Sequence, residues 1–304
     1  MRANPADYEL VAPGNLPDVL SLLAKEPGAW LPIAGGTDVM VLYAAGKLPA
    51  RKLVSIWNLP ELRRIEVLPA EVHVGGACTY TDLQEHVIIR REFPLLCLAG
   101  SWTGGIANQN RGTIGGNIAN ASPAGDSLPP LLAYEADLLL VSARGERRVP
   151  YRSFHIGYRK TQLGPDELIR AVCLPRQFSK YYAYVRKVGT RNAQAIAKVS
   201  LAALALINDG ANNHRTNDDP ANNRGVIEDV RLAMGSVAPV PLRLAATEKI
   251  LKGKRVDSQL VRLAGQAAAS EILPIDDIRS TARYRTAVAA NLVAEFLQRL
   301  SAAG

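Results

Sequence analysis

Two glycine-rich segments carry the residue types best suited to holding an anion. The first is Ala34-Gly35-Gly36-Thr37-Asp38 and the second is Thr113-Ile114-Gly115-Gly116-Asn117. Glycine pairs lack Cβ atoms, so their backbone N–H groups can approach a ligand closely and adopt φ angles closed to other residues. Each segment alone is more typical of a tight turn. Together they predict a site that clasps both phosphates of a dinucleotide.

Neither segment matches a common nucleotide fingerprint. The chain has no G-x-G-x-x-G and no G-x-x-x-x-G-K-[ST] sequence, which argues against a Rossmann domain and a P-loop NTPase. It also lacks the G-x-S-x-G elbow of a serine nucleophile. The predicted site is therefore one for binding a cofactor, with no catalytic nucleophile, acid or base in view.

The cysteines and histidines are too scattered to predict a metal site or a catalytic triad. No two cysteines have CxxC spacing, so neither zinc nor a local iron–sulfur cluster is expected. We interpret the cysteines as reduced, small apolar residues. The residues concerned are Cys78, Cys97, Cys173, His73, His86, His155 and His214.

Bulk composition indicates a folded protein of one large or two modest domains. The 304 residues are 48% hydrophobic and 21% charged. The net charge of +8 is spread along the chain and only 6% of residues are aromatic, so nucleic acid is not the expected partner. No apolar run reaches the roughly 18 residues that span a bilayer, and the first residues lack a secretory signal. We expect a cytoplasmic protein that does not enter a membrane.

Local patterns predict an α+β amino-terminal half followed by strands and then helices. Thr81 is expected to cap a helix that ends near Arg91, and 104–126 is expected to be an unusually long connector. A polar surface loop is predicted at 208–224. The remaining expected strands are 8–12, 30–34, 52–57, 65–67, 72–74, 182–187, 199–207 and 226–234, with a hairpin at 137–149 turning at Arg144-Gly145. The remaining expected helices are 16–23, capped by Asn15, and 39–45, 128–134, 244–251, 258–270 and 281–302, with another opened by Pro94.

The second glycine segment extends into a highly specific motif. It continues through Ile118-Ala119-Asn120-Ala121-Ser122-Pro123-Ala124-Gly125-Asp126. With the first segment it resembles the two FAD loops of the molybdenum hydroxylase flavoprotein subunits, the family of xanthine dehydrogenase and carbon monoxide dehydrogenase. The resemblance covers nearly the whole chain, including 228–239 and Tyr284-Arg285 near the carboxy terminus. It implies a two-part FAD-binding domain of the p-cresol methylhydroxylase (PCMH/VAO) type at 1–177 and a smaller α+β domain at 178–304, a β-sheet packed with helices.

The resemblance also implies which residues hold FAD. Backbone groups of the two loops would bind the pyrophosphate, Asp126 would accept hydrogen bonds from FAD hydroxyls, Ile169 would pack on the flavin and Lys187 would place a cation beside it. The full set is Pro32, Ile33, Ala34, Gly35, Gly36, Thr37, Asp38, Gly104, Thr113, Ile114, Gly115, Gly116, Asn117, Asp126, Ile169 and Lys187. Gly115→Val is expected to push methyl groups into the phosphate loop and to abolish FAD retention.

The chain departs from parts of the family pattern. No cysteine lies between Cys97 and Cys173, so the extra iron–sulfur cluster of some relatives is not expected. Thr103 stands where an aromatic residue stacks on adenine in animal relatives, with Trp102 beside it. Neither loop contains His or Cys, so we expect non-covalent FAD. The segment 186–198 resembles a loop that lies near the flavin in relatives.

The resemblance implies an electron-transfer subunit. A large partner subunit would carry the molybdenum cofactor, a small one the [2Fe–2S] clusters, and the chain's FAD would pass electrons to NAD, quinone or oxygen in a heterotrimer or its dimer. Two alternatives remain open. One is a self-contained flavin reductase of the MurB type, and the other is a basic binding module that has lost its cofactor.

Overall fold

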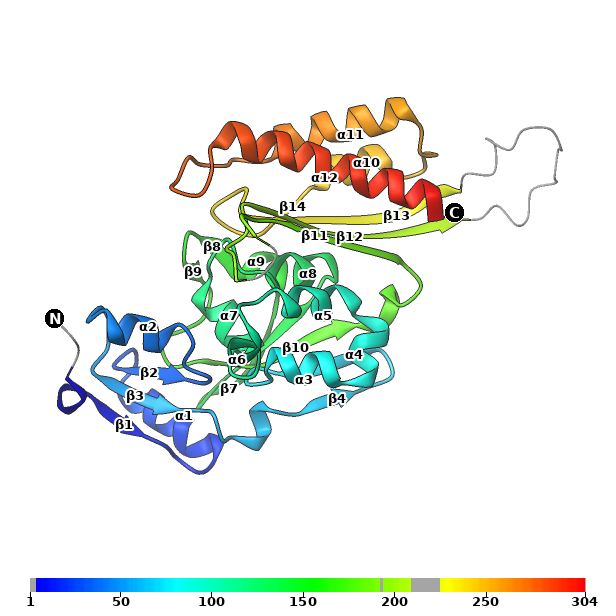
Figure 1. The fold of residues 1–304 in the computed structure, drawn as a ribbon. Coiled ribbons are helices and arrows are strands. Elements are labelled where there is room, and N and C mark those ends of the chain that lie inside the picture. Colours follow the sequence, from blue (N-terminus) through cyan, green and yellow to red (C-terminus); the bar gives the residue numbers. More distant parts are fainter. Residues whose placement is uncertain (1–3, 192–193, 209–224, 304) are drawn as a thin grey trace.

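The computed structural model describes residues 4–191, 194–208 and 225–303, and it shows an α+β protein built on three main sheets (Figure 1). The sheets have three, five and four strands, and a two-stranded ribbon is formed by β8 (His155–Gly157) and β9 (Lys160–Thr161). The predicted fold class is confirmed. Apart from Asn208, the predicted loop 208–224 lies outside the described residues.

The amino-terminal sheet is parallel and small. It has the order β1 (Glu9–Val11), β3 (Lys52–Ser55) and β2 (Trp30–Ile33). The Asn15 side chain accepts a hydrogen bond from the Asp18 amide at 2.9 Å and starts α1 (Leu16–Lys25), as predicted. The loop after β2 leads into α2 (Val39–Ala44), which positions the first glycine segment at the carboxyl end of β2. A 3-10 turn, η1 (Pro5–Asp7), precedes β1.

The five-stranded sheet contains the predicted hairpins and one strand that we did not predict. Its order is β4 (Ile65–Val67), β5 (Glu71–Gly75), β10 (Leu168–Pro175), β6 (Asp137–Ser142) and β7 (Gly145–Pro150). The unpredicted strand is β10, which pairs with both β5 and β6 at the sheet's centre. Ser142 pairs with Gly145, so the β6–β7 turn consists of Ala143 and Arg144, one residue earlier than expected. The 3-10 turn η2 (Pro60–Leu62) precedes β4.

The helices beside this sheet correct two predictions. Thr79, not Thr81, caps the first of them, because Thr79 and Asp82 exchange reciprocal backbone–side-chain hydrogen bonds at 3.1 and 2.8 Å. The helix also breaks at His86, giving α3 (Tyr80–Glu85) and α4 (Val87–Glu92). The expected connector 104–126 is not irregular throughout, since it contains α6 (Ile106–Gln109) and α7 (Ile114–Asn120). The other helices here are α5 (Pro94–Ser101), α8 (Leu128–Ala133) and α9 (Tyr151–Phe154).

The carboxy-terminal sheet is antiparallel and is covered on both faces (Figure 1). Along the strand Val199–Asn208, Ala202 and Leu204 belong to the core shared with α5 and α8, while Leu201 and Ala203 belong to the core under the three carboxy-terminal helices. This alternation follows from the two-residue period of a strand. The strands are β11 (Tyr182–Val188), β12 (Val199–Asn208), β13 (Val226–Gly235) and β14 (Leu242–Arg243), and the helices are α10 (Ala245–Leu251), α11 (Ser258–Glu271) and α12 (Ala282–Ala303), after the turn η3 (Arg176–Phe178). None of the helices in the described parts of the chain combines the length and the apolar composition needed to cross a bilayer.

Candidate functional site

The first glycine segment forms an open turn between β2 and α2. Gly36 has a φ of +78°, a conformation that glycine adopts without steric cost. A Cβ on Gly35 would lie 1.5 Å from the carbonyl oxygen of Arg111, so only glycine allows this approach. Among the described residues, no hydrogen-bond acceptor is found for the backbone N–H groups of 35–38. These amides are therefore free to donate to an anionic ligand.

The second glycine segment is the start of α7, and its amides are used within the protein. Thr113 caps the helix by accepting from the Gly116 amide at 3.1 Å. The amides of Ile114 and Gly115 donate to the carbonyls of Cys78 and Gly76 at 3.0 and 2.9 Å, and the amide of Asn117 donates to Thr113. What this segment offers a ligand is the exposed surface of Gly116 and the side chain of Asn117.

Gly115 faces protein backbone, which changes the expected effect of a larger side chain. A Cβ there would lie 2.5 Å from the carbonyl oxygen of Gly76. Gly115→Val would thus force α7 away from the turn at Gly76 that follows β5, and any loss of ligand would follow from that distortion, not from methyl groups in a phosphate loop. The two glycine segments also lie close to each other. Arg111, two residues before the second segment, contacts Gly35 of the first.

Asp126 and Lys187 form a buried ion pair beside the second motif. The Lys187 Nζ atom lies 2.7 Å from Asp126 Oδ2 and donates to the Trp102 carbonyl at 3.2 Å. Both side chains are about nine-tenths buried, at 9% and 10% exposure. Asp126 Oδ1 is buried without a hydrogen-bond partner. Burial raises the pKa of Asp126 to about 6, against the opposing effect of the Lys187 ammonium.

Strand alternation explains why Lys187 reaches this site. Ala183 and Val185 pack against the amino-terminal core, and Lys187 follows on the same face of β11. The predicted flavin-side segment 186–198 also approaches the turn before α6, because a Cβ on Gly105 would lie 2.8 Å from Gln194 Nε2. Residues 192–193 of this segment lie outside the described residues.

A buried hydroxyl chain leads from the core to Asn117. The Tyr80 hydroxyl lies 3.1 Å from Ser127 Oγ, and Ser127 Oγ donates to Asn117 Oδ1 at 2.8 Å. Tyr80 and Ser127 are 1% and 0% exposed. Neither residue was among the sequence-derived candidates, since Tyr80 precedes the motif by more than thirty positions and Ser127 directly follows its end.

Gly104, Ile169 and Thr103 lie around the same framework. Gly104 has a φ of +65° in the turn between α5 and α6. Ile169 is 7% exposed on β10, and its carbonyl oxygen lies 2.1 Å from where a Cβ of Gly76 would be. Thr103 donates to the Ala99 carbonyl at 3.1 Å and so completes the end of α5.

Gly76 is a structural residue of the site that sequence analysis missed. It joins three elements, because its amide donates to Arg170 at 2.9 Å and its carbonyl accepts from Gly115. The signal was present in the sequence as a further glycine pair, Gly75-Gly76, directly after the alternating residues 72–74.

Two family models match the chain in succession. The FAD binding domain of molybdopterin dehydrogenases matches residues 6–177, and the CO dehydrogenase flavoprotein C-terminal domain matches residues 183–300. The chain belongs to the FAD-binding medium subunits of the molybdenum hydroxylases. The family resemblance of the motifs and the oxidoreductase class are thereby confirmed.

Individual relatives agree along nearly their whole length. The xanthine dehydrogenase FAD-binding subunit of Escherichia coli O157:H7 is 32% identical over 282 residues, covering 92% of this chain and 90% of the relative. The glyceraldehyde dehydrogenase medium chain of Sulfolobus acidocaldarius is 28% identical, covering 93% and 95%. In the solved carbon monoxide dehydrogenase of Hydrogenophaga pseudoflava, a chain 27% identical superposes with a TM-score of 0.86, and 97% of each chain is covered.

The geometry fits the FAD that this family of medium subunits binds. The free amides of 35–38 suit the oxygens of a pyrophosphate. The unpartnered Oδ1 of Asp126 is a buried acceptor that only a donor from outside the described residues can satisfy. A ribityl or ribose hydroxyl has the required chemistry.

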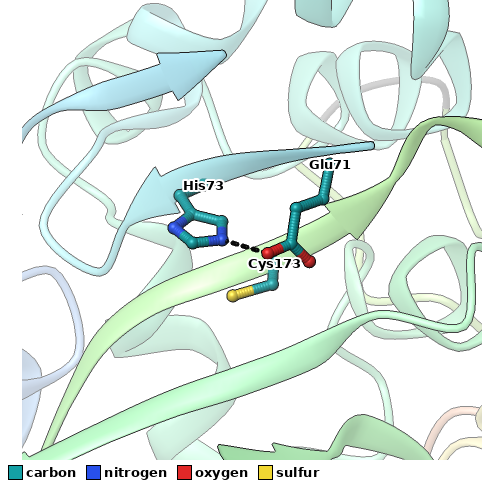
Figure 2. A group of neighbouring side chains, drawn as sticks. All are labelled: Glu71, His73 and Cys173. Atoms are coloured by element: carbon teal, nitrogen blue, oxygen red, sulfur yellow. Dashed lines mark hydrogen bonds and ion pairs between the residues drawn. The ribbon is translucent and has the colours of Figure 1, made fainter. Parts of the chain in front are cut away.

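A second polar group lies on the outer side of the five-stranded sheet. Figure 2 shows Glu71, His73 and Cys173 together on β5 and β10, and their potential ligand atoms lie within 4.8 Å of one another. This group could not be recognised in the sequence, because His73 and Cys173 are far apart in the chain and become neighbours only when β5 pairs with β10. Arg148 donates to both Glu71 carboxylate oxygens, at 3.2 and 2.6 Å, and lowers the pKa of Glu71 to about 2. We interpret the group as an ion-pair network, and the absence of a metal stays a prediction.

The cysteines have the chemistry of buried apolar residues. Burial raises the thiol pKa of Cys78 to about 12 and those of Cys97 and Cys173 to about 11. At neutral pH all three are protonated and weakly nucleophilic.

Proposed function

We propose that this chain is the electron-transfer subunit of a molybdenum-dependent hydroxylase or dehydrogenase. It holds FAD non-covalently, receives electrons from the [2Fe–2S] clusters of a small partner subunit and delivers them to NAD, quinone or oxygen. Substrate oxidation takes place on a large partner subunit that carries the molybdenum cofactor. The names of its relatives support this role, since each is described as the FAD-binding subunit or medium chain of a dehydrogenase.

The observation that carries the proposal is the buried Asp126–Lys187 pair with its unpartnered oxygen. A lone buried acceptor is costly unless a ligand completes it. Asp126 is the last residue of the second motif, in a chain whose family binds FAD. The residues proposed to contact or support FAD are Pro32, Ile33, Ala34, Gly35, Gly36, Thr37, Asp38, Gly104, Thr113, Ile114, Gly115, Gly116, Asn117, Asp126, Ile169 and Lys187.

The protein supplies position and electrostatics. When bound, FAD provides both one-electron and two-electron transfer. The amides of 35–38 donate to the pyrophosphate, and Asp126 accepts from a hydroxyl. In this water-poor site the Lys187 ammonium favours the charged form of Asp126, which keeps that carboxylate an acceptor for a ligand hydroxyl. Residues 1–177 form the proposed FAD domain, and 178–304 contribute Lys187 and complete the site.

The proposed assembly is a heterotrimer with one large and one small partner subunit, or its dimer. We infer a cytoplasmic location from the reduced state expected of the three thiols. Neither nucleic acid nor a membrane has a role in this proposal.

The test is the absorbance spectrum of the purified chain and the identity of any released chromophore. Flavin bands near roughly 450 nm, with FAD released intact on denaturation, support the proposal. Rapid reduction of that FAD only when the reduced [2Fe–2S] subunit is added supports the electron path. A chain that takes up no FAD contradicts the proposal. A chain that oxidises NAD(P)H and reduces a substrate alone favours a flavin reductase of the MurB type.

A further inference from the structure

We propose that Tyr80 and Ser127 are positioning residues of the flavin site, whose hydroxyl groups hold the Asn117 side chain with its Nδ2 amide facing the cofactor. The inference rests on the proposed function and adds two residues to it. Neither belongs to a glycine motif, and neither hydroxyl is exposed to solvent.

The Ser127 hydroxyl is available because of the prolines that follow it. Ser127 occupies the N-cap position of α8, where a serine usually accepts from an amide two or three residues later. Those positions are Pro129 and Pro130, which have no N–H group. Ser127 therefore makes no capping bond, and its hydroxyl turns to Asn117 Oδ1 at 2.8 Å.

The direction of the hydrogen bonds follows from counting protons. A serine hydroxyl has one hydrogen, and Asn117 Oδ1 can only accept. Because Ser127 donates to Asn117, it must accept from the Tyr80 hydroxyl at 3.1 Å. Burial raises the pKa of Tyr80, so the phenol keeps the proton that it donates.

The result is a fixed orientation of the Asn117 amide. Oδ1 is bonded by Ser127 and is confined by Gly125, where a Cβ would lie 3.0 Å away. Among the described residues, Nδ2 of Asn117 has no acceptor. Nδ2 is not among the buried unpartnered atoms of the described residues, so it reaches the surface, where the neighbouring Gly116 is also exposed. The side chain thus presents two N–H donors outward. The matching ligand atom is an acceptor, such as a carbonyl oxygen, a ring nitrogen or a phosphate oxygen of FAD.

A double-mutant cycle tests this relay. FAD is titrated into flavin-free protein, and dissociation constants are compared for the unaltered chain, Ser127→Ala, Asn117→Ala and the double variant. Loss of one hydrogen bond that orients a donor is expected to weaken binding about fivefold to tenfold in Ser127→Ala. In the Asn117→Ala background the same change is expected to have no further effect. Tyr80→Phe is expected to fall between, because Ser127 can still donate.

Tyr151→Phe is the matched control. Tyr151 is also fully buried, and its hydroxyl pairs with His155 Nε2 at 3.1 Å instead of with Ser127 or Asn117. It should lose similar thermal stability while keeping the FAD dissociation constant of the unaltered chain. Equal affinity in Ser127→Ala and the unaltered chain, or additive effects in the double variant, would overturn the relay alone. Failure of the unaltered chain to bind FAD would overturn both the proposed function and the relay.

Discussion

Asp126 shows how one residue meets two opposing demands. Burial disfavours its charge, while Lys187 at 2.7 Å favours it, and the balance leaves the pKa at about 6. Among the described residues, the other carboxylate oxygen, Oδ1, has no hydrogen-bond donor although it is buried. Such a group is expected at a binding site, where a ligand supplies the missing donor.

Asp126→Asn is expected to weaken FAD binding by about tenfold or more, because a hydrogen bond to a charged acceptor is replaced by one to a neutral amide. The affinity of the unaltered chain should fall as the pH is lowered through about 6, since the protonated carboxyl loses acceptor capacity. Asp126→Asn should be flat over that range. Titrations with FAD from pH 5 to about 8 measure both effects. A parallel pH dependence in the variant would assign the titration to another group.

The outer group of Glu71, His73 and Cys173 has ligand types that zinc uses, but its charges are already compensated. The Arg148 guanidinium binds Glu71, and the Cys173 thiol has a pKa of about 11. Equimolar Zn²⁺ is therefore expected to leave the melting temperature unchanged. Calorimetry with and without the metal checks this. A rise of several degrees that disappears in Cys173→Ser but persists in Cys78→Ser would reveal a metal site.

The backbone of Gly76 joins three elements, because the end of β5, the strand β10 and the start of α7 meet there. A Cβ would lie 2.1 Å from the Ile169 carbonyl oxygen, which belongs to a central strand and cannot move aside cheaply. Gly76→Ala is expected to destabilise the protein by about 3 kcal/mol. The matched control is Gly14→Ala, where nothing lies within 4 Å and the effect should be near zero. Chemical denaturation of flavin-free protein measures the difference, and equal stability of the two variants would contradict this account.

Elements with a clear local signal could be predicted from the sequence. The α1 cap at Asn15, the alternating strand β5 and the long apolar run of β12 depend on neighbours in sequence, and their positions are confirmed within a few residues. The strand β10 was missed because its run at 168–175 is shorter than that of β12, is interrupted by Arg170 and lacks the period of a half-buried strand. The break at His86 was missed because this one residue both ends α3 and caps α4. With no loop between them, the two helices look like one longer helix in the sequence.

The candidate site could be predicted in part. The glycine motifs are local in sequence, so the loops were evident. Which amides stay free is decided by partners such as Gly76 and Cys78, which lie far away in the chain. The Tyr80–Ser127–Asn117 chain has the same character, because only folding brings its hydroxyls together.

In the whole molecule, the carboxy-terminal sheet packs on the amino-terminal half and supplies residues to its candidate site and to its core. Its β11 strand carries Lys187 to Asp126, and the Ser236 amide donates to the Pro123 carbonyl at 2.9 Å inside the second motif. Gly235 packs so closely on Pro129 that a Cβ would lie 3.0 Å from its ring. The sheet also supplies Ala202 and Leu204 to the core that contains α8.

A chain ending at residue 177 is therefore expected to lose FAD even though it contains both glycine motifs. Asp126 would lose its cation, and the surface of α8 that packs on β12 and β13, including Pro129, would be exposed to water. The fragment should aggregate on size-exclusion chromatography and should elute without flavin absorbance. Co-expression of residues 178–304 as a separate chain should restore flavin in a one-to-one complex, because the lost contacts are non-covalent. If the fragment alone kept FAD with the affinity of the whole chain, Lys187 and the carboxy-terminal sheet would have no part in holding the cofactor.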